Sequence, residues 1–144
     1  MYNVLEIAHK ILNKATQTEF EEPISNLKLQ KLLYYMQGFH LAYFDTPLFD
    51  DDIEAWMYGP VVPCVYNHFK KNENRGITYT KEVISLNSEE EKLFDEVYNV
   101  YNSYSAIGLM NLTHSETPWK TTPTGIGSII EKTKLKSYFK KKLK

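Results

Sequence analysis

The strongest constraint on the fold is the segment from Leu27 to Phe44, which would be apolar around almost its whole circumference if wound as a helix. Its apolar positions are Leu27, Leu29, Leu32, Leu33, Tyr34, Tyr35, Met36, Phe39, Leu41, Ala42, Tyr43 and Phe44. A surface helix carries one apolar stripe, whereas a helix that is apolar all round is buried. We therefore expect a central buried helix over about residues 26–43, with Ser25 as its N-cap.

Shorter amphipathic stretches predict the helices that would cover this central one. Asn3 is a suitable N-cap for a first helix, and Ser105 is suitable for a short helix that runs through Leu112. The run Ser88 to Glu91 matches a capping box, in which a Ser side chain and a Glu three residues later bond reciprocally. Pro60 or Pro63 could occupy the first turn of another helix, where the missing N–H is harmless.

Two segments have the pattern of short strands. Residues 53–58 alternate so that Ile53, Ala55 and Met57 would share one face of a strand. Residues 77–84 are rich in Thr, Tyr, Val and Ile, and could pair with 53–58 as a small antiparallel β element. With no internal repeat or linker, the 144 residues suit one domain, 1–144. The expected class is α+β, mostly helical.

Cysteine content and hydropathy limit the compartment. The single cysteine, Cys64, excludes an intramolecular disulfide framework. The chain has no run of about 18 apolar residues and no basic-then-apolar leader at its start. These features favour a cytoplasmic location and no membrane partner.

Candidate reactive groups are few and poorly matched to known chemistry. Cys64 and His68 are four residues apart on a presumed helix, but two ligands are too few for zinc, and we expect Cys64 to be a small buried residue. The run Asp50 to Asp52 lacks the spacing of a calcium loop and reads as a solvated turn. His114, Ser115 and Glu116 contain the residue types of a nucleophilic triad, but sequence neighbours rarely reach its geometry. We expect no catalytic residue, metal or cofactor, and we do not expect the protein to be an enzyme.

Aromatic side chains gather around the Gly59-Pro60 break. If the alternation of residues 53–58 holds, Trp56 and Tyr58 point away from the buried face of the strand. Tyr and Trp are frequent anchors of protein interfaces, although burial in the core is the simpler explanation for them. We predict a partner-binding region of Trp56, Tyr58, Gly59, Pro60, Tyr66 and Trp119. Trp119 is also expected to dock on the core and to hold residues 114–127 as an ordered loop.

The C-terminal segment of about residues 132–144 carries seven lysines and no acidic residue. Its apolar residues Leu135, Tyr138, Phe139 and Leu143 would lie on one face of a helix, so a terminal helix docked on the domain is the favoured interpretation. The alternative is contact with nucleic acid phosphates. The formal net charge of −1 weakens that alternative, because the chain has no overall field that attracts nucleic acid.

An ordered set of motifs carries a resemblance to a known family. The helix start LKLQKLLYY, the loop with Pro47-Leu48-Phe49, the run AWMYGPVVPCVYNHFK and the later HSETPW resemble the Panacea domain, also called the SocA-like antitoxin domain and linked to the phage-associated GepA-like proteins. The resemblance covers roughly residues 1–139. It implies an antitoxin that neutralises a toxin encoded by an adjacent gene by binding it directly, or as an adaptor that delivers it to a protease. A nucleic-acid-binding phage or prophage regulator is the alternative, and the oligomeric state stays open.

Overall fold

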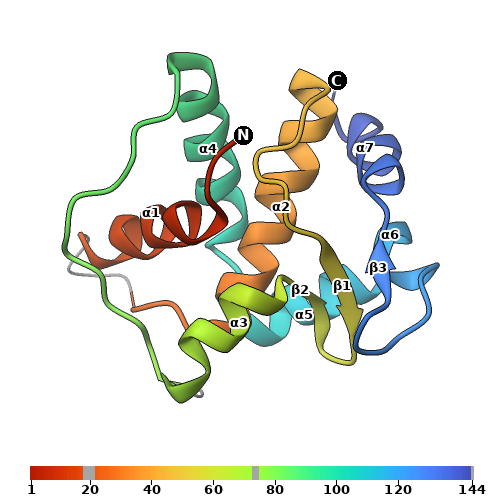
Figure 1. Cartoon of the computed structure of the whole chain (residues 1–144), viewed down its shortest axis with the longest axis horizontal. Coiled ribbons are helices and arrows are strands. Elements are labelled where there is room, and N and C mark those ends of the chain that lie inside the picture. Colours follow the sequence, from red (N-terminus) through yellow and green to blue (C-terminus); the bar gives the residue numbers. More distant parts are fainter. Residues whose placement is uncertain (18–21, 73–74, 144) are drawn as a thin grey trace.

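The computed structural model describes residues 1–17, 22–72 and 75–143, and its class is α+β, as predicted. One helix, α2 (Asn26–Phe44), runs through the middle of the molecule (Figure 1). It lies between α1 (Val4–Thr16) and α4 (Ser88–Tyr101) on one side and α7 (Lys132–Lys140) on the other. In the described part of the chain, no helix combines the length and hydropathy needed to cross a membrane.

The central helix is confirmed with almost the predicted bounds. The Ser25 hydroxyl accepts a hydrogen bond from the Lys28 amide, and the helix ends at Asp45, whose φ of 62° lies in the left-handed region. Burial extends round the helix, and the side chains of Leu29, Leu33 and Tyr35 are fully enclosed. At roughly 1.5–3 kcal/mol for each large apolar side chain removed from water, this helix supplies much of the driving force for folding.

Polar side chains of α2 are also buried, and they hold neighbouring loops in place. The Gln37 amide nitrogen donates to the Phe49 carbonyl, and its oxygen accepts from the Leu48 amide at 2.7 Å. His40 lies 2.6 Å from both the Thr46 carbonyl and the Glu90 carboxylate. Because unpaired buried polar groups cost free energy, these contacts fix the loop that follows α2.

The sheet has three short antiparallel strands in the order β2-β1-β3. β1 (Ile53–Trp56) pairs with β2 (Gly59–Val61) through a tight turn, and with β3 (Ile129–Ile130) on its other edge. Ile53 and Ala55 face the core, as predicted. Met57 does not, because the strand ends at Trp56 and Met57 belongs to the exposed turn.

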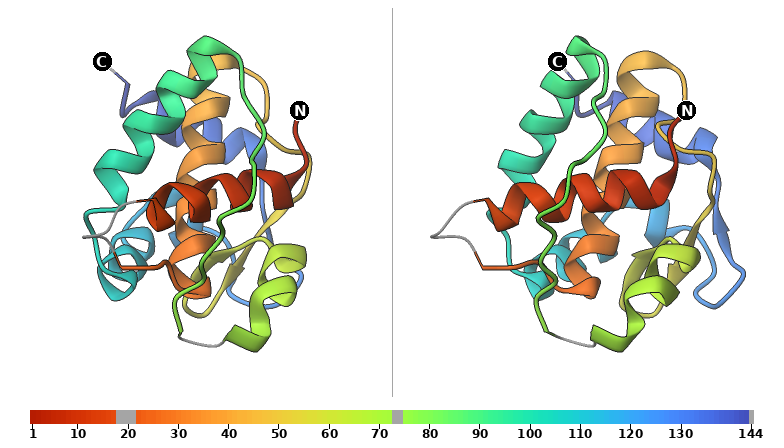
Figure 2. Two further views of the ribbon diagram at one scale, coloured as in Figure 1. Left: turned by 90° about the vertical axis from the view of Figure 1, so that its left-hand side faces the viewer. Right: turned by 60° about the vertical axis from the view of Figure 1, so that its left-hand side comes forward.

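The predicted pairing of residues 77–84 with residues 53–58 is wrong. Among the described residues, the 77–84 segment forms only an isolated bridge, from Ile77 to Ile24. The chain from residue 75 to 87 instead runs extended across the outer face of α1 (Figure 2). Side chains of α1 donate hydrogen bonds to backbone carbonyls of this extended segment: Lys10 donates to the Ile84 carbonyl and Asn13 to the Tyr79 carbonyl. A segment rich in β-branched residues thus meets a helix where a strand partner was expected.

The capping box that opens α4 lies one residue earlier than predicted. Asn87, rather than Ser88, is the N-cap; its side chain accepts from the Glu90 amide at 2.9 Å, and Glu90 accepts in return from the Asn87 amide. Glu91 instead accepts from the Leu86 amide and pairs with Lys10 at 2.7 Å. Both Asn87 and Ser88 are good N-cap residues with a Glu three positions later, so the sequence signature did not distinguish them.

Several short helices of the described residues pack around this centre. α3 (Pro63–Phe69) begins at Pro63, continues into the short 3-10 helix η1 (Lys70–Asn72), and buries Val65 and Phe69. α5 (Ala106–His114) is capped by Ser105, as predicted. The expected loop 114–127 contains a short helix, α6 (Thr117–Lys120), because Pro118 suits a first helical turn.

The lysine-rich C-terminal segment forms a helix that docks on the domain, as predicted. Leu135 and Phe139 are buried, and Tyr138 and Leu143 pack against the same core. The helix ends at Lys140, short of residue 144. Gly38 of α2 lies against the Phe139 ring, and a Cβ at this position would overlap that ring. The absence of a side chain at Gly38 therefore permits the close approach of α2 and α7.

We predict that Gly38→Ala destabilises the protein by up to about 2 kcal/mol. Alanine improves helix propensity by about 1 kcal/mol, but overpacking against the Phe139 ring costs about 1–3 kcal/mol and outweighs that gain. Urea unfolding followed by circular dichroism measures the change. Phe139→Leu should partly restore stability in the Gly38→Ala background while destabilising the wild type. Additive effects of the two substitutions would contradict the proposed clash.

Candidate functional site

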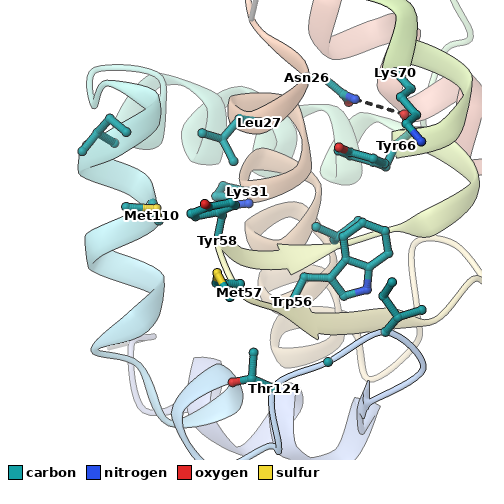
Figure 3. Close-up of a pocket in the computed structure, with 14 residues that line it drawn as sticks. Asn26, Leu27, Lys31, Trp56, Met57, Tyr58, Tyr66, Lys70, Met110 and Thr124 are labelled. Carbon is teal, nitrogen blue, oxygen red and sulfur yellow. Dashed lines mark hydrogen bonds between the residues drawn. The ribbon is translucent and has the colours of Figure 1, made fainter. Parts of the chain in front are cut away.

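The main cavity of the described structure has a volume of about 1050 Å³ and opens beside the β1–β2 turn. We call it the hairpin pocket. The N-terminal half of α2, the β-hairpin, α3, α5 and the loop before β3 surround it (Figure 3). Its lining is mostly apolar and includes Leu27, Trp56, Met57, Tyr58, Val61, Tyr66, Ile107, Met110 and Ile126. A cavity of this size and composition is typical of a binding site.

Apolar side chains also stand out at the rim of the hairpin pocket. Met57 and Tyr58 are 66% and 62% exposed, and Ile107 and Ile126 are exposed as well. These residues come from the hairpin turn, from α5 and from the loop before β3. Exposed large apolar residues clustered round a concave surface mark interaction sites more often than singly scattered ones do.

Lys31 lies at the floor of the hairpin pocket. Figure 3 shows it between Met110 on one side and Trp56 and Tyr66 on the other. Its side chain is fully buried, and its amine has no hydrogen-bond partner among the described residues. Burial lowers the pKa of this amine from its ordinary value of 10.5 to about 7. A lysine that is both buried and unpaired is costly to keep, which makes it a functional-site candidate.

The backbone at Gly59 passes directly over the Lys31 side chain. Gly59 has a φ of 113°, and a Cβ at this position would come within 2.6 Å of the Lys31 Cε. Glycine is therefore required both for the conformation and for the close approach. A chain of side-chain bonds from α2 holds the hairpin nearby: Gln30 accepts from the Val62 amide at 2.9 Å, and Asn26 donates to the Tyr66 carbonyl.

His114 and Trp119 support the hairpin from behind. The Trp119 indole N–H donates to the Trp56 carbonyl at 2.8 Å, and its ring stacks on the His114 imidazole with centroids 4.0 Å apart. Burial lowers the pKa of His114, and the nearby Lys31 acts in the same direction. Lys31 and His114, which could each carry a positive charge, thus lie close together, and the pKa of each is lowered.

Glu116 forms a separate buried cluster and does not complete a triad with His114. Its carboxylate accepts from the hydroxyls of Tyr34 and Tyr35 at 3.0 and 3.1 Å. Burial raises the pKa of Glu116, although these two hydrogen bonds oppose the shift. The contacts join the segment before α6 to the centre of α2, so Glu116 has a positioning role in the fold.

The six residues predicted to bind a partner divide into three groups. Trp56, Tyr58 and Tyr66 line the hairpin pocket. Gly59 and Pro60 are buried within β2 and shape the hairpin, and Trp119 packs behind it. Lys31, Met110 and Ile126 also line the pocket and were not predicted from the sequence. Lys31 carried a usable signal, since a lysine within a helix that is buried all round must itself be enclosed.

Other candidates have simpler roles. Cys64 is exposed, which corrects the expectation of a buried thiol; α3 turns it outward, where it donates to Asp51 at 3.4 Å. Burial and the neighbouring carboxylate raise the pKa of its thiol to about 11, which lowers its reactivity. His68 is exposed, and Asp50 to Asp52 form an exposed turn. Within the described ranges, no three His, Cys, Asp or Glu side chains are grouped to hold a metal ion.

Several lysines of α7 are engaged within the protein. Lys136 and Lys140 both pair with Asp45, at 2.9 and 3.3 Å, and hydrogen bonds from them hold the pKa of Asp45 below its usual value. Lys132 pairs with Asp52 at 3.2 Å. Acidic side chains therefore offset part of the positive charge that the nucleic acid alternative requires.

We predict that Lys31→Met raises stability most at low pH. A lysine pKa that falls from 10.5 to about 7 on folding disfavours the folded state by up to about 5 kcal/mol below pH 7. Between pH 7 and 10.5 the unfolded chain binds more protons, so this penalty shrinks as the pH rises. The stability advantage of Lys31→Met over wild type should fall by about 2–3 kcal/mol from pH 6 to pH 9. Urea unfolding at both values measures it, and parallel pH curves would contradict it.

Comparisons with known proteins place the chain. The family model described as "Antitoxin SocA-like, Panacea domain" matches residues 29–120, which hold most of α2 with Lys31, the hairpin and the HSETPW segment. Antitoxin SocA of Caulobacter vibrioides (strain NA1000 / CB15N) is 33% identical over 137 residues, covering 85% of this chain and 71% of that protein. No solved structure gives a significant match. This chain belongs to the SocA-like antitoxin family with a Panacea domain.

Proposed function

We propose that this protein is an antitoxin that binds a toxin encoded by an adjacent gene and neutralises it through direct contact at the hairpin pocket. Membership of the SocA-like family points to a role in a toxin–antitoxin system. The observation that supports the location is the apolar rim of the pocket, where Met57 and Tyr58 are about two-thirds exposed. Aromatic and Met side chains at the edge of a cavity are the type of residue that anchors protein interfaces.

The geometry suits a protein partner better than a nucleic acid. Pocket walls are largely apolar, and the lysines of α7 lie on another part of the molecule, where Asp45 and Asp52 engage three of them. Nucleic acid binding depends on cationic side chains that neutralise phosphates. A toxin that inserts apolar side chains into the pocket would instead gain free energy from their burial.

Two routes to neutralisation are consistent with binding at this surface. The antitoxin could cover the toxin's active surface, or it could deliver the bound toxin to a protease as an adaptor. The two routes differ in the fate of the toxin, because steric blocking leaves its amount unchanged and delivery lowers it. Toxin abundance in cells that carry both genes therefore separates them.

The test is co-expression with the product of the adjacent gene, followed by co-purification. Growth should be restored in cells that the neighbour alone would arrest, and the two proteins should elute as one complex. A neighbour that is harmless and does not bind would overturn the proposal. Quantitative blotting of the toxin, with and without the antitoxin, distinguishes blocking from delivery.

We predict that Tyr58→Ala weakens toxin binding roughly 30-fold, the effect typical of an interface hot spot, while stability changes by less than about 0.5 kcal/mol. Tyr58 is exposed in a turn, so its removal leaves no cavity in the core. The matched control is Tyr43→Ala: Tyr43 is 60% exposed but lies at the far end of α2, away from the pocket. Calorimetric titration measures both affinities. Equal effects of the two substitutions would place the toxin elsewhere.

A further inference from the structure

Lys31 gives the hairpin pocket a specific chemical preference. Its amine lies at a cavity whose lining is mostly apolar, and it has no hydrogen-bond partner within the described structure. We propose that Lys31 is the receptor for one acidic side chain, Asp or Glu, which the toxin inserts into the hairpin pocket from within an apolar segment. This inference rests on the proposed function and adds the chemistry of the partner at the same site.

The charged groups around the pocket favour an anion. No Asp or Glu is among the described residues that line it, and Lys70 at the rim adds a second positive charge. The titratable side chains of Tyr58 and Tyr66 also line the pocket, and His114 lies behind the hairpin, where Lys31 contributes to lowering its pKa. The nearby carboxylate of Glu54 already accepts from the Trp56 indole and from the Gly127 amide. An incoming carboxylate would therefore meet a cation and no competing acid.

The distribution of apolar side chains indicates an internal acidic residue rather than a chain end. Exposed apolar residues stand on separate sides of the pocket: Met57 and Tyr58 on the hairpin, Ile107 on α5, and Ile126 before β3. A segment that passes over the pocket can place apolar side chains on both sides of its acid. A C-terminal carboxylate has neighbours on one side only and would leave part of this rim uncovered.

Access to Lys31 requires a local rearrangement of the rim. The side chain has no accessible surface, so an incoming carboxylate reaches the amine only after groups at the rim move. Met57 and Tyr58 are the ones available, because their exposure means that moving them disrupts little core packing. Side-chain rotations of this kind are common at interfaces whose backbones stay fixed.

The pairing links binding to proton uptake. In the free protein the amine is largely neutral above pH 7, since burial holds its pKa near that value. A carboxylate at hydrogen-bond distance favours the ammonium form and raises the pKa again. The complex at pH 8 should therefore take up close to one proton from the buffer, whereas at pH 6 the amine already carries its proton and uptake should be much smaller.

The experiment is calorimetric titration of the full-length antitoxin with the co-purifying product of the adjacent gene. Titrations at pH 8 in phosphate and in Tris, which differ in ionisation enthalpy, give the number of protons taken up. Lys31→Met should weaken binding about 30-fold or more and abolish the uptake, because one partner of a buried charge pair is lost. Lys92→Met is the matched control, because Lys92 is exposed on α4 and does not line the pocket; it should change affinity less than about threefold and keep the uptake.

The partner side completes the test. Each Asp and Glu of the toxin is changed to Asn or Gln, and one of these substitutions should match the loss caused by Lys31→Met. Combined with Lys31→Met, that substitution should cause little further loss, which is the signature of a direct pair. Because the proton count is measured on the wild-type pair, the test does not depend on how well any variant folds.

Three outcomes would overturn the inference, and they are distinct from failure of the proposed function. If Tyr58→Ala weakens binding while Lys31→Met does not, the toxin binds at the pocket without using the amine. If coupling to Lys31 is found with the toxin's C-terminal carboxylate, the receptor binds a chain end and not an internal acid. A wild-type complex that takes up no proton at pH 8 excludes the pair. Absence of any complex would instead refute the proposed function, and the inference with it.

Discussion

Burial of most of α2 is the constraint on which the rest of the structure depends. Where this helix is enclosed, its polar side chains must be satisfied inside the protein, since water cannot reach them. Gln37 does so by bonding the Leu48 and Phe49 backbone, and His40 by bonding Thr46 and Glu90. The polar residues of this helix therefore act as anchors that decide where the following loop lies.

The position of the hairpin also depends on contacts made by buried side chains of α2. Gln30 accepts from the Val62 amide, Gly59 lies directly over Lys31, and the Trp119 indole binds the Trp56 carbonyl from behind. These contacts come from separate parts of the chain and converge on residues 56–62. The hairpin backbone is thereby fixed while the side chains of its turn face outward, an arrangement that presents binding groups on a rigid support.

Features set by local chemistry could be predicted from the sequence, and features set by distant partners could not. The bounds of α2, the caps at Asn3, Ser25 and Ser105, and the docking face of α7 follow from helical periodicity and capping. The strand partners did not follow, because residues 77–84 and 129–130 compete for β1 through contacts that no local pattern encodes. The pocket needed both kinds of information. Its aromatic lining was recognisable near Gly59, whereas Met110 and Ile126 reach it only through the tertiary fold.

Lys31 shows how the fold and the candidate site are connected. Gln30, its neighbour in sequence, is buried on the same helix and hydrogen-bonded through both its amide nitrogen and its oxygen, so the surroundings can satisfy a polar group. Folding alone does not require an amine at position 31, because an apolar side chain of similar length would fill the space without a desolvation penalty. The unpaired amine also lies where the covering of α2 is interrupted by a cavity rather than in the closed core. A destabilising group placed at such an opening is the pattern expected when stability is given up for binding.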